Sequence, residues 1–245
     1  WYCSALPPLR VLGVNIADSF CGILGDMNVL DVNSLLPLSG LYITGTDTGI
    51  GKTHASVALI QALRSAGRRV AGMKPVASGC VYVDGRWRNE DALALMAAAD
   101  SRAEYATVNP YALPDATAPQ LAAARAGVSL DMQVMLDAYR LLAVDVDTVL
   151  VEGVGGWLAP LSDSIDQLDL VRSLDLPVLI VVGLRLGCIN HARLTEQAVL
   201  ASGSRLLGWL ANAVEPGFDE EGQYFDALSR SMQTPCLGRL PFVKQ

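Results

Sequence analysis

The chain has 245 residues, enough for one large domain or two small ones. Hydrophobic residues make up 51% of it and charged residues 18%, which excludes a disordered chain and a collagen-like one. Its formal net charge is −7, so we expect no nucleic-acid partner, because binding to phosphate backbones requires clustered Lys and Arg. The five cysteines are odd in number and form no C-x-x-C pair, which argues against a disulfide framework or a zinc site and favours a reducing cytoplasm.

The first 40 residues differ from the rest of the chain. They begin at Trp1, contain one basic residue, Arg10, and interrupt their apolar stretches with proline and polar residues, unlike a secretory signal. No window reaches the ~18 consecutive apolar residues of a membrane span, so we expect no membrane partner. We predict an N-terminal extension over residues 1–40, disordered or not native before Met27, and one domain over residues 41–245.

From residue 41 onward the chain alternates between strand and helix patterns. We predict a strand over 41–44, an amphipathic helix over 52–66, a strand over 69–73, a hairpin over 81–87 that turns at Asp84-Gly85, and a helix over 89–99 capped by Asn89. Three prolines and little periodicity predict a loop over 106–119, followed by helical patterns from Gln120 and over 129–143.

The second half of the chain continues this alternation. Strands are predicted over 148–152, 177–183, 206–211 and 236–240, and helices over 190–201 and 221–232. The segment 177–183 is nearly all Val, Leu and Ile, as is typical of a parallel strand covered on both faces. Strands separated by helices favour right-handed crossovers, so we predict a single α/β domain with a doubly wound, mostly parallel sheet flanked by helices.

A glycine-rich segment, Gly45-Thr-Asp-Thr-Gly-Ile-Gly-Lys-Thr53, joins the first predicted strand to the first predicted helix. In a phosphate-binding loop at this position, Lys52 would reach the β- and γ-phosphates and the Thr53 hydroxyl would bind Mg²⁺. The usual pattern G-x-x-x-x-G-K-[ST] places its first glycine where this chain has Thr46, so the match fails by one position. An ordinary glycine-rich turn is the alternative. The Gly-Lys-Thr ending at a helix start favours nucleotide binding and a P-loop NTPase-like fold.

Charged residues at other predicted strand ends and helix starts could join this site. Glu152 ends a predicted strand and precedes several glycines, which makes it a candidate Mg²⁺ ligand. Lys74 follows the second predicted strand, where a fixed cation could face a transferring phosphoryl group, and an exposed surface lysine is the alternative. By itself, Asp91 is interpreted as structural, a favourable partner of its helix dipole. Neither His54 nor His191 has a partner at metal-ligand spacing.

Six segments together resemble the dethiobiotin synthetase family of biotin biosynthesis. They are the phosphate loop, Lys74-Pro-Val-Ala-Ser-Gly79, Tyr105-Ala-Thr-Val-Asn-Pro-Tyr111, Val151-Glu-Gly-Val-Gly-Gly-Trp157, Pro160-Leu-Ser-Asp163 and Gly187-Cys-Ile-Asn-His191. The phosphate loop alone is shared by many ATPases, whereas its combination with the segments at 74–79 and 187–191 is far more specific. The resemblance extends from about residue 41 to residue 243.

The resemblance implies an ATP- and Mg²⁺-dependent ligase that works as a cytoplasmic homodimer. The family joins 7,8-diaminononanoate and CO₂ into dethiobiotin through a carbamate and a carbamic-phosphoric anhydride, and it releases ADP and phosphate. Carbamate and triphosphate are both anions and repel each other unless cations lie between them. Lys52, Lys74 and Mg²⁺ would supply that positive charge.

The resemblance also implies roles for individual residues. The catalytic group is Lys74, Lys52, Thr48 and Ser78, and the metal ligands are Thr53, Asp91 and Glu152. ATP binding is implied for Gly49, Ile50, Gly51, Lys52, Thr53, His54, Asp91, Glu152, Gly153, Val154, Gly155, Asn212, Ala213, Pro241, Phe242 and Val243, with Asn212 reading the adenine. Substrate binding is implied for Ser78 near the carbamate, and for a second group that would hold the substrate carboxylate across the dimer interface: Cys188, Ile189, Asn190 and Tyr224.

The chain also departs from the family pattern. Gly49 stands where some members carry an acidic residue, Gln120 stands where a histidine is frequent, and the chain ends at Gln245, two residues past the base-binding strand. ATP affinity or base selectivity is the property that we expect the short end to affect most.

Two rival functions share the predicted architecture. An amide-forming ATPase of the cobyrinic acid type would add a glutamine-hydrolysing domain, for which this chain leaves no room. A dimeric partition-type switch ATPase, which binds protein partners, would carry a lysine in place of Thr46. The switch ATPase is kept as the alternative function.

Overall fold

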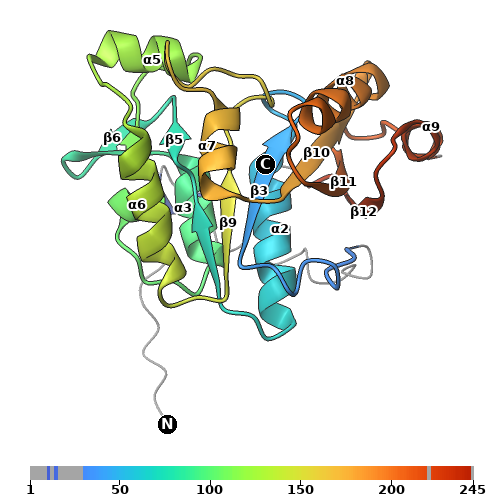
Figure 1. The fold of residues 1–245 in the computed structure, drawn as a ribbon, viewed down its shortest axis with the longest axis horizontal. Helices are drawn as coiled ribbons and strands as arrows, with labels where there is room; N and C mark the ends of the chain where they lie inside the picture. Colours follow the sequence, from blue (N-terminus) through green and yellow to red (C-terminus); the bar gives the residue numbers. More distant parts are fainter. Residues whose placement is uncertain (1–9, 12–13, 16–29, 220–221, 244–245) are drawn as a thin grey trace.

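The computed structural model describes residues 10–11, 14–15, 30–219 and 222–243, and its centre is a six-stranded sheet (Figure 1). The strands lie in the order β12-β11-β10-β3-β9-β4, and all neighbouring pairs run parallel. Their bounds are β3 Gly40–Gly45, β4 Val70–Met73, β9 Thr148–Glu152, β10 Val178–Leu184, β11 Leu206–Ala213 and β12 Cys236–Leu240. The predicted parallel α/β fold is confirmed.

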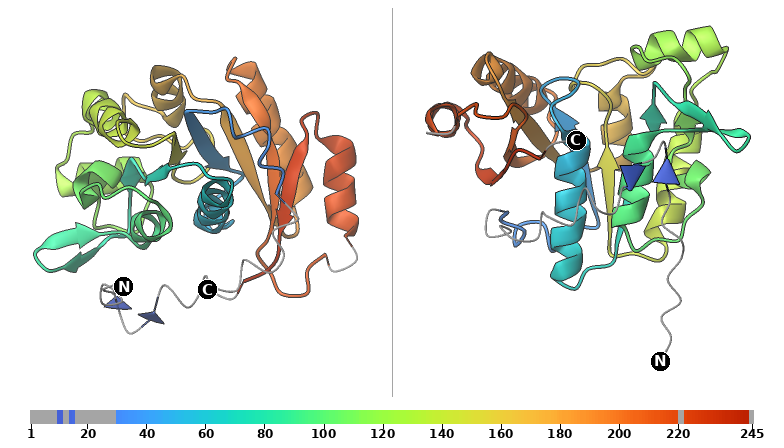
Figure 2. Two further views of the ribbon diagram at one scale, coloured as in Figure 1. Left: turned by 90° about the horizontal axis from the view of Figure 1, so that it is seen from below. Right: turned by 180° about the vertical axis from the view of Figure 1, so that it is seen from behind.

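Helices cover both faces of the sheet, as Figure 2 shows from two further directions. Alternate residues of β3 point to opposite faces, so Leu41 and Ile43 join one apolar cluster while Tyr42 joins the other. The first cluster is closed by helices α2 (Lys52–Ser65) and α3 (Glu90–Ala98). The second is closed by helices α6 (Met132–Ala143), α7 (Gln167–Leu174), α8 (Cys188–Ala201) and α9 (Gln223–Ser231).

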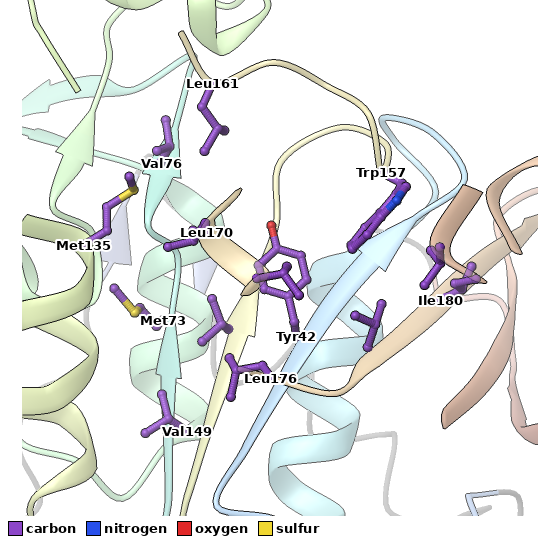
Figure 3. Close-up of a cluster of buried hydrophobic side chains, with 14 of the residues drawn as sticks. Tyr42, Met73, Val76, Met135, Val149, Trp157, Leu161, Leu170, Leu176 and Ile180 are labelled. Carbon is purple, nitrogen blue, oxygen red and sulfur yellow. The ribbon is translucent and has the colours of Figure 1, made fainter. Parts of the chain in front are cut away.

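The central strands are apolar because they are covered on both faces. All seven residues of β10 are buried, which accounts for its run of Val, Leu and Ile. In the second cluster, shown in Figure 3, Tyr42 of β3 lies between Leu170 of α7 and Trp157. Each fully buried side chain of this size contributes about 1.5–3 kcal/mol relative to exposure. The sheet is therefore a rigid base for the loops at its edges.

The smaller elements lie around this sheet. The strands β6 (Val81–Val83) and β7 (Arg86–Arg88) form the predicted hairpin, and its turn residues Asp84 and Gly85 have φ of 49° and 77°. Asn89 caps α3 as predicted, since its side chain accepts hydrogen bonds from two backbone N–H groups of the first turn. The remaining elements are β1 Arg10–Val11, β2 Val14–Asn15, β5 Val76–Ala77, α4 Tyr105–Val108, β8 Tyr111–Ala112 and α5 Pro119–Ala126.

Three sequence predictions are corrected by the structure. The predicted loop over 106–119 is wrong in part, because most of α4 and all of β8 lie within it, and β8 pairs with β5. Helix α7 has no counterpart among the predicted elements. The helix predicted from residue 190 begins two residues earlier, at Cys188, because Gly187 adopts the left-handed conformation that ends the preceding loop.

The chain that precedes β3 also packs onto the domain. Leu35 is 1% exposed and belongs to the cluster closed by α2 and α3, so part of the predicted extension contributes to the core. Residues 16–29 lie outside the described residues, and the predicted start at Met27 stays a prediction. In the described part of the chain, no helix has the length and apolar character needed to cross a membrane.

Candidate active site

The loop between β3 and α2 has the conformation of a phosphate-binding loop. Gly49 and Gly51 lie in the left-handed region, with φ of 71° and 77°, which glycine adopts without strain. Lys52 is the first residue of α2, and its side chain is buried. Its Nζ donates a hydrogen bond to the Asp47 carbonyl oxygen at 2.8 Å. The lysine therefore folds back over the loop that precedes it.

A cavity of about 810 Å³ opens beside this loop. It lies at the carboxyl ends of the strands, where ligands bind in open α/β sheets. Its wall consists of Asp47, Thr48, Gly49, Gly51, Lys52, Thr53, Lys74, Ala77, Ser78, Asn89, Glu90, Asp91, Ala116, Thr117, Ala118, Pro119, Glu152, Val154, Gly155, Gly156 and Ala159. The structure thus brings all four predicted catalytic residues, Thr48, Lys52, Lys74 and Ser78, to one cavity.

Lys74 lies at the centre of a buried ionic cluster. Its Nζ is 2.7 Å from Glu152 Oε1, 3.0 Å from Asp91 Oδ2 and 3.2 Å from the Gly153 carbonyl oxygen. The register of the sheet explains this meeting, because β4 and β9 are neighbours and Lys74 and Glu152 both lie at their carboxyl ends. Lys74 is 3% exposed and Glu152 is 0% exposed, so neither charge can be satisfied by water.

Asp91 and Thr53 complete this cluster. Asn89 caps α3 by accepting a hydrogen bond from the backbone N–H of Asp91 at 3.0 Å, which leaves the Asp91 carboxylate facing Lys74. The Thr53 hydroxyl lies 2.7 Å from Asp91 Oδ1 and 2.9 Å from Glu152 Oε1. Asp91 therefore contacts both Lys74 and Thr53, in addition to its favourable position at a helix start.

The pKa values of the two buried lysines, Lys52 and Lys74, are shifted in opposite directions. Burial lowers the pKa of Lys52 to about 8, and the Lys74 ammonium adds to this effect. Burial would also lower the pKa of Lys74, but the carboxylates of Glu152 and Asp91 outweigh it and hold that pKa above its ordinary value. In the same way, burial would raise the pKa of Asp91, and the Lys74 ammonium outweighs burial and lowers it. Lys74 is therefore a permanent cation at neutral pH.

The oxygen atoms of this cluster fit a small divalent cation. Thr53, Asp91 and Glu152 offer one hydroxyl and two carboxylates, and Mg²⁺ prefers such hard oxygen ligands, completed by water and phosphate. Glu152 Oε2 is buried and has no hydrogen-bond partner, which is an incomplete arrangement for a carboxylate. Among the described residues, no group of three or more His, Cys, Asp or Glu forms a separate all-protein metal cage.

The residues expected at the adenine lie behind the phosphate loop and outside this cavity. Asn212, at the carboxyl end of β11, is buried, and its Nδ2 donates to the Ile50 carbonyl oxygen at 2.9 Å. Its Oδ1 lies 3.0 Å from His54 Nδ1. A Cβ atom at Gly51 would overlap the Asn212 amide, so this glycine is also required for packing. Residues 241–243 follow β12 directly, beside the end of β11.

The expected carboxylate-binding residues form a second location. Cys188, Ile189 and Asn190 are the first three residues of α8, and none of them lines the cavity. Tyr224 lies in the first turn of α9, where its ring contacts Phe218 at 4.6 Å between centroids. The predicted catalytic residues therefore meet in one cavity, whereas the residues expected to bind the carboxylate lie outside it.

The sequence predictions missed one residue that shapes the cavity wall. Gln167, the first residue of α7, is 1% exposed and bonds to the loop that follows β9. The signal that could have located this helix is the capping box formed by Asp166 and Asp169, which precedes an apolar pattern. Another side-chain hydrogen bond joins Gln120, which donates through Nε2, to Asp163 Oδ1 at 2.5 Å.

The chain is similar to known proteins over most of its length. A family model described as an AAA domain matches residues 39–245. An ATP-dependent dethiobiotin synthetase BioD of Xanthomonas euvesicatoria is 55% identical over 201 residues, which cover 82% of this chain and 90% of that protein. The protein of the same name from Xylella fastidiosa is 51% identical over 208 residues, covering 85% of this chain and 92% of that protein.

Solved structures show the same fold at much lower identity. The MinC:MinD cell division protein complex of Aquifex aeolicus is 15% identical, with a TM-score of 0.53 and coverage of 83% of this chain and 81% of that chain. The MinD cell division protein of the same organism is also 15% identical, with a TM-score of 0.50 and coverage of 83% and 82%. These matches concern the fold alone, whereas the sequence relatives are far closer. The chain therefore belongs to the family of ATP-dependent dethiobiotin synthetases.

Proposed function

We propose that this chain closes the ureido ring of dethiobiotin from 7,8-diaminononanoate, CO₂ and ATP. The observation that carries the proposal is the wall of the cavity, where two buried lysines, two carboxylates and a phosphate-binding loop meet. Its membership of a family of ATP-dependent synthetases supports the same reaction.

The ATP phosphates would be bound by the loop from Gly49 to Thr53, with Lys52 as the cation at the β- and γ-phosphates. The oxygens of Thr53, Asp91 and Glu152 would hold Mg²⁺. When bound, Mg²⁺ supplies positive charge to the phosphate oxygens. Val154 and Gly155 would form the wall opposite the phosphate loop, and Gly153 precedes them and accepts a hydrogen bond from Lys74.

The chemistry would proceed in three balanced steps. One substrate amine adds to CO₂, loses a proton and becomes a carbamate. A carbamate oxygen then attacks the γ-phosphorus, ADP leaves, and a carbamic-phosphoric anhydride forms. The second amine finally attacks the carbonyl carbon, a proton is lost, phosphate leaves, and the ring closes.

The side chains act in these steps by charge and position. Lys74, held at a fixed point by Glu152, would face the carbamate together with Thr48 and Ser78. Lys52 would stabilise the transferring phosphoryl group from the opposite side. Phosphoryl transfer leaves little covalent work to the protein, so orientation and fixed positive charge would supply most of the acceleration.

We assign the adenine to the ends of β11 and β12. Asn212, Ala213 and the segment 241–243 lie there, and Asn212 contacts the back of the phosphate loop through Ile50. His54 would contribute through its contact with Asn212. These contacts support a base site on the side of the loop away from Lys74.

We also infer a cytoplasmic homodimer. The segment at the start of α8 exposes large apolar side chains, Leu186 at 79% and Leu194 at 57%, close to Cys188, Ile189 and Asn190. The N–H groups at a helix start are a suitable receptor for the substrate carboxylate, with Tyr224 as an additional donor. In a dimer this segment would complete the cavity of the partner subunit. The described cysteines, Cys80, Cys188 and Cys236, are all free thiols, which supports a reducing compartment.

The decisive experiment measures phosphate release from ATP with the diamine and bicarbonate present or omitted, together with mass spectrometry of the product. We expect release that depends on both compounds and a product with the mass of dethiobiotin. Phosphate release that ignores the diamine would contradict the synthetase and support the switch ATPase. Omitting Mg²⁺ in the same assay tests the proposed cation.

A further inference from the structure

The loop that follows β9 is held by one buried side chain from α7. Gln167 is 1% exposed, although it is the first residue of its helix. Its amide reaches back 11 to 13 residues along the chain to Gly156 and Val154. A polar side chain so completely buried at a helix start requires partners, and here the partners are the backbone of the cavity wall.

Every hydrogen-bonding position of this amide is used. Gln167 Oε1 accepts from the backbone N–H of Val154 at 2.9 Å and from the Tyr42 hydroxyl at 2.8 Å. Gln167 Nε2 donates to the carbonyl oxygens of Val154 at 2.8 Å and Gly156 at 2.6 Å, and it makes a longer contact of 3.5 Å with the carbonyl oxygen of Ala159. An amide offers two donors and two principal acceptor sites, so the side chain has no freedom to turn.

The residues around the Gln167 amide hold it in place. A Cβ atom at Gly153 would overlap Gln167 Oε1 and would lie 2.6 Å from the Tyr42 hydroxyl, so only glycine fits there. The capping box of Asp166 and Asp169 fixes the start of α7. Tyr42 is 1% exposed and belongs to the same buried cluster as Leu170 and Trp157 (Figure 3). The amide is therefore anchored to the core and not to a mobile surface.

The segment that Gln167 holds lies against the phosphate loop. Val154, Gly155 and Gly156 all line the cavity. The Cβ position of Gly155 is 3.7 Å from Thr48 Oγ1, and that of Gly156 is 3.5 Å from the Gly45 carbonyl oxygen. A shift of this segment would therefore change the space between the two loops, where the phosphates are proposed to bind.

We propose that Gln167 is a positioning residue of the active site, which sets the separation between the loop after β9 and the phosphate loop. The inference rests on the proposed function, because only a nucleotide in this cavity makes that separation matter. Gln167 does not line the cavity and acts through the backbone atoms that its amide contacts, chiefly those of Val154 and Gly156. Displacements of about 1 Å in such supporting groups reduce activity ~10- to 100-fold.

The test compares two variants of similar size. Gln167→Met keeps the length of the side chain and removes the hydrogen bonds of the amide. Tyr42→Phe is the matched control, because it removes one buried hydrogen bond to the same amide oxygen and leaves the bonds to the loop intact. For Gln167→Met we expect kcat/KM for ATP to fall ~10- to 100-fold and ATP binding to weaken. For Tyr42→Phe we expect a lower Tm with kinetics close to those of the wild type.

The outcomes separate this inference from the proposed function. If the wild-type protein forms no dethiobiotin, the proposed function itself is refuted. Wild-type activity together with unchanged kcat/KM and ATP affinity in folded Gln167→Met would overturn the role of Gln167. If Gln167→Met does not fold, Gln167→Asn replaces it, since this amide is one methylene too short to reach Tyr42 and both carbonyl oxygens together. Unchanged kinetics in that variant would overturn the inference equally.

Discussion

The buried lysine of the ionic cluster provides the sharpest test of the site. Lys74→Gln removes an ammonium group that lies 2.7 Å from Glu152 and 3.0 Å from Asp91. Glu152 is 0% exposed and one of its oxygens already has no partner, so the variant leaves a buried carboxylate without its cation. Breaking a buried ion pair from one side costs about 3–5 kcal/mol of folding free energy.

Catalysis and binding should respond differently to this change. Lys74 would act on the carbamate and the transferring phosphoryl group, so we expect turnover to fall ~100- to 1,000-fold, as for other fixed stabilising groups. ATP affinity should change little, because Lys52 and the backbone of the phosphate loop remain. The assays are diamine-dependent phosphate release and equilibrium binding of ATP. Turnover equal to that of the wild type would remove Lys74 from the catalytic set.

The loss of folding stability in Lys74→Gln is also predicted to depend on pH. The Lys74 ammonium lowers the pKa of Asp91, so the stabilisation of Asp91 is present above its unfolded value of ~4 and is lost as the pH falls through its lower folded pKa. The loss of stability in Lys74→Gln should therefore be largest near neutral pH and smaller in acid, as measured by urea unfolding. Arg64→Gln is the control, because it breaks an exposed ion pair with Asp100 worth about 0–1 kcal/mol. A deficit in Lys74→Gln that does not vary with pH would refute the ion-pair explanation.

Three further predictions concern the loop, the cation and the core. Gly51→Ala forces a side chain into a left-handed position and against Asn212, so we expect a loss of at least ~1–2 kcal/mol in urea unfolding and weaker ATP binding. Thr53→Val should raise the Mg²⁺ concentration for half-maximal turnover at least ~10-fold, and an unchanged Mg²⁺ titration would exclude Thr53 as a ligand. Burial raises the pKa of Tyr105 to about 12. Its stabilisation is present below the unfolded value of ~10 and is lost as the pH rises toward 12, so Tyr105→Phe should reduce the alkaline slope of the unfolding free energy.

The fold could be predicted because its main elements carry local signals. The strands of the sheet appear as apolar runs, and the hairpin turn at Asp84-Gly85 needs residues that tolerate positive φ. By contrast, α4 has four residues and β8 has two, and both are too short to show a period. They exist because the surrounding structure pairs them, as β8 pairs with β5. Local patterns cannot reveal elements that depend on distant contacts.

The same limit applies to the site. Lys52, Lys74 and Glu152 could be found because each follows a predicted strand, or the loop after one, and parallel strands end at one edge. Asp91 reaches the cluster from a helix, and its position alone indicates only a dipole partner. Gln167 acts through backbone atoms of another segment, so no residue pattern identifies it. Local sequence patterns therefore do not reveal contacts between a side chain and a distant segment of the backbone.

The strand order explains how one edge of the sheet can hold both proposed sites, one for the reacting groups and one for the base. The phosphate loop follows β3, which lies in the interior of the sheet between β10 and β9. On the β9 side, β9 and β4 end at Glu152 and Lys74, where the reacting groups are proposed. On the β10 side, β11 ends at Ala213, one residue after Asn212, and β12 ends at Leu240, just before residues 241–243, where the base is proposed. A triphosphate that crosses from one side to the other must pass over the phosphate loop, so the position of Lys52 between the two groups follows from the topology of the sheet.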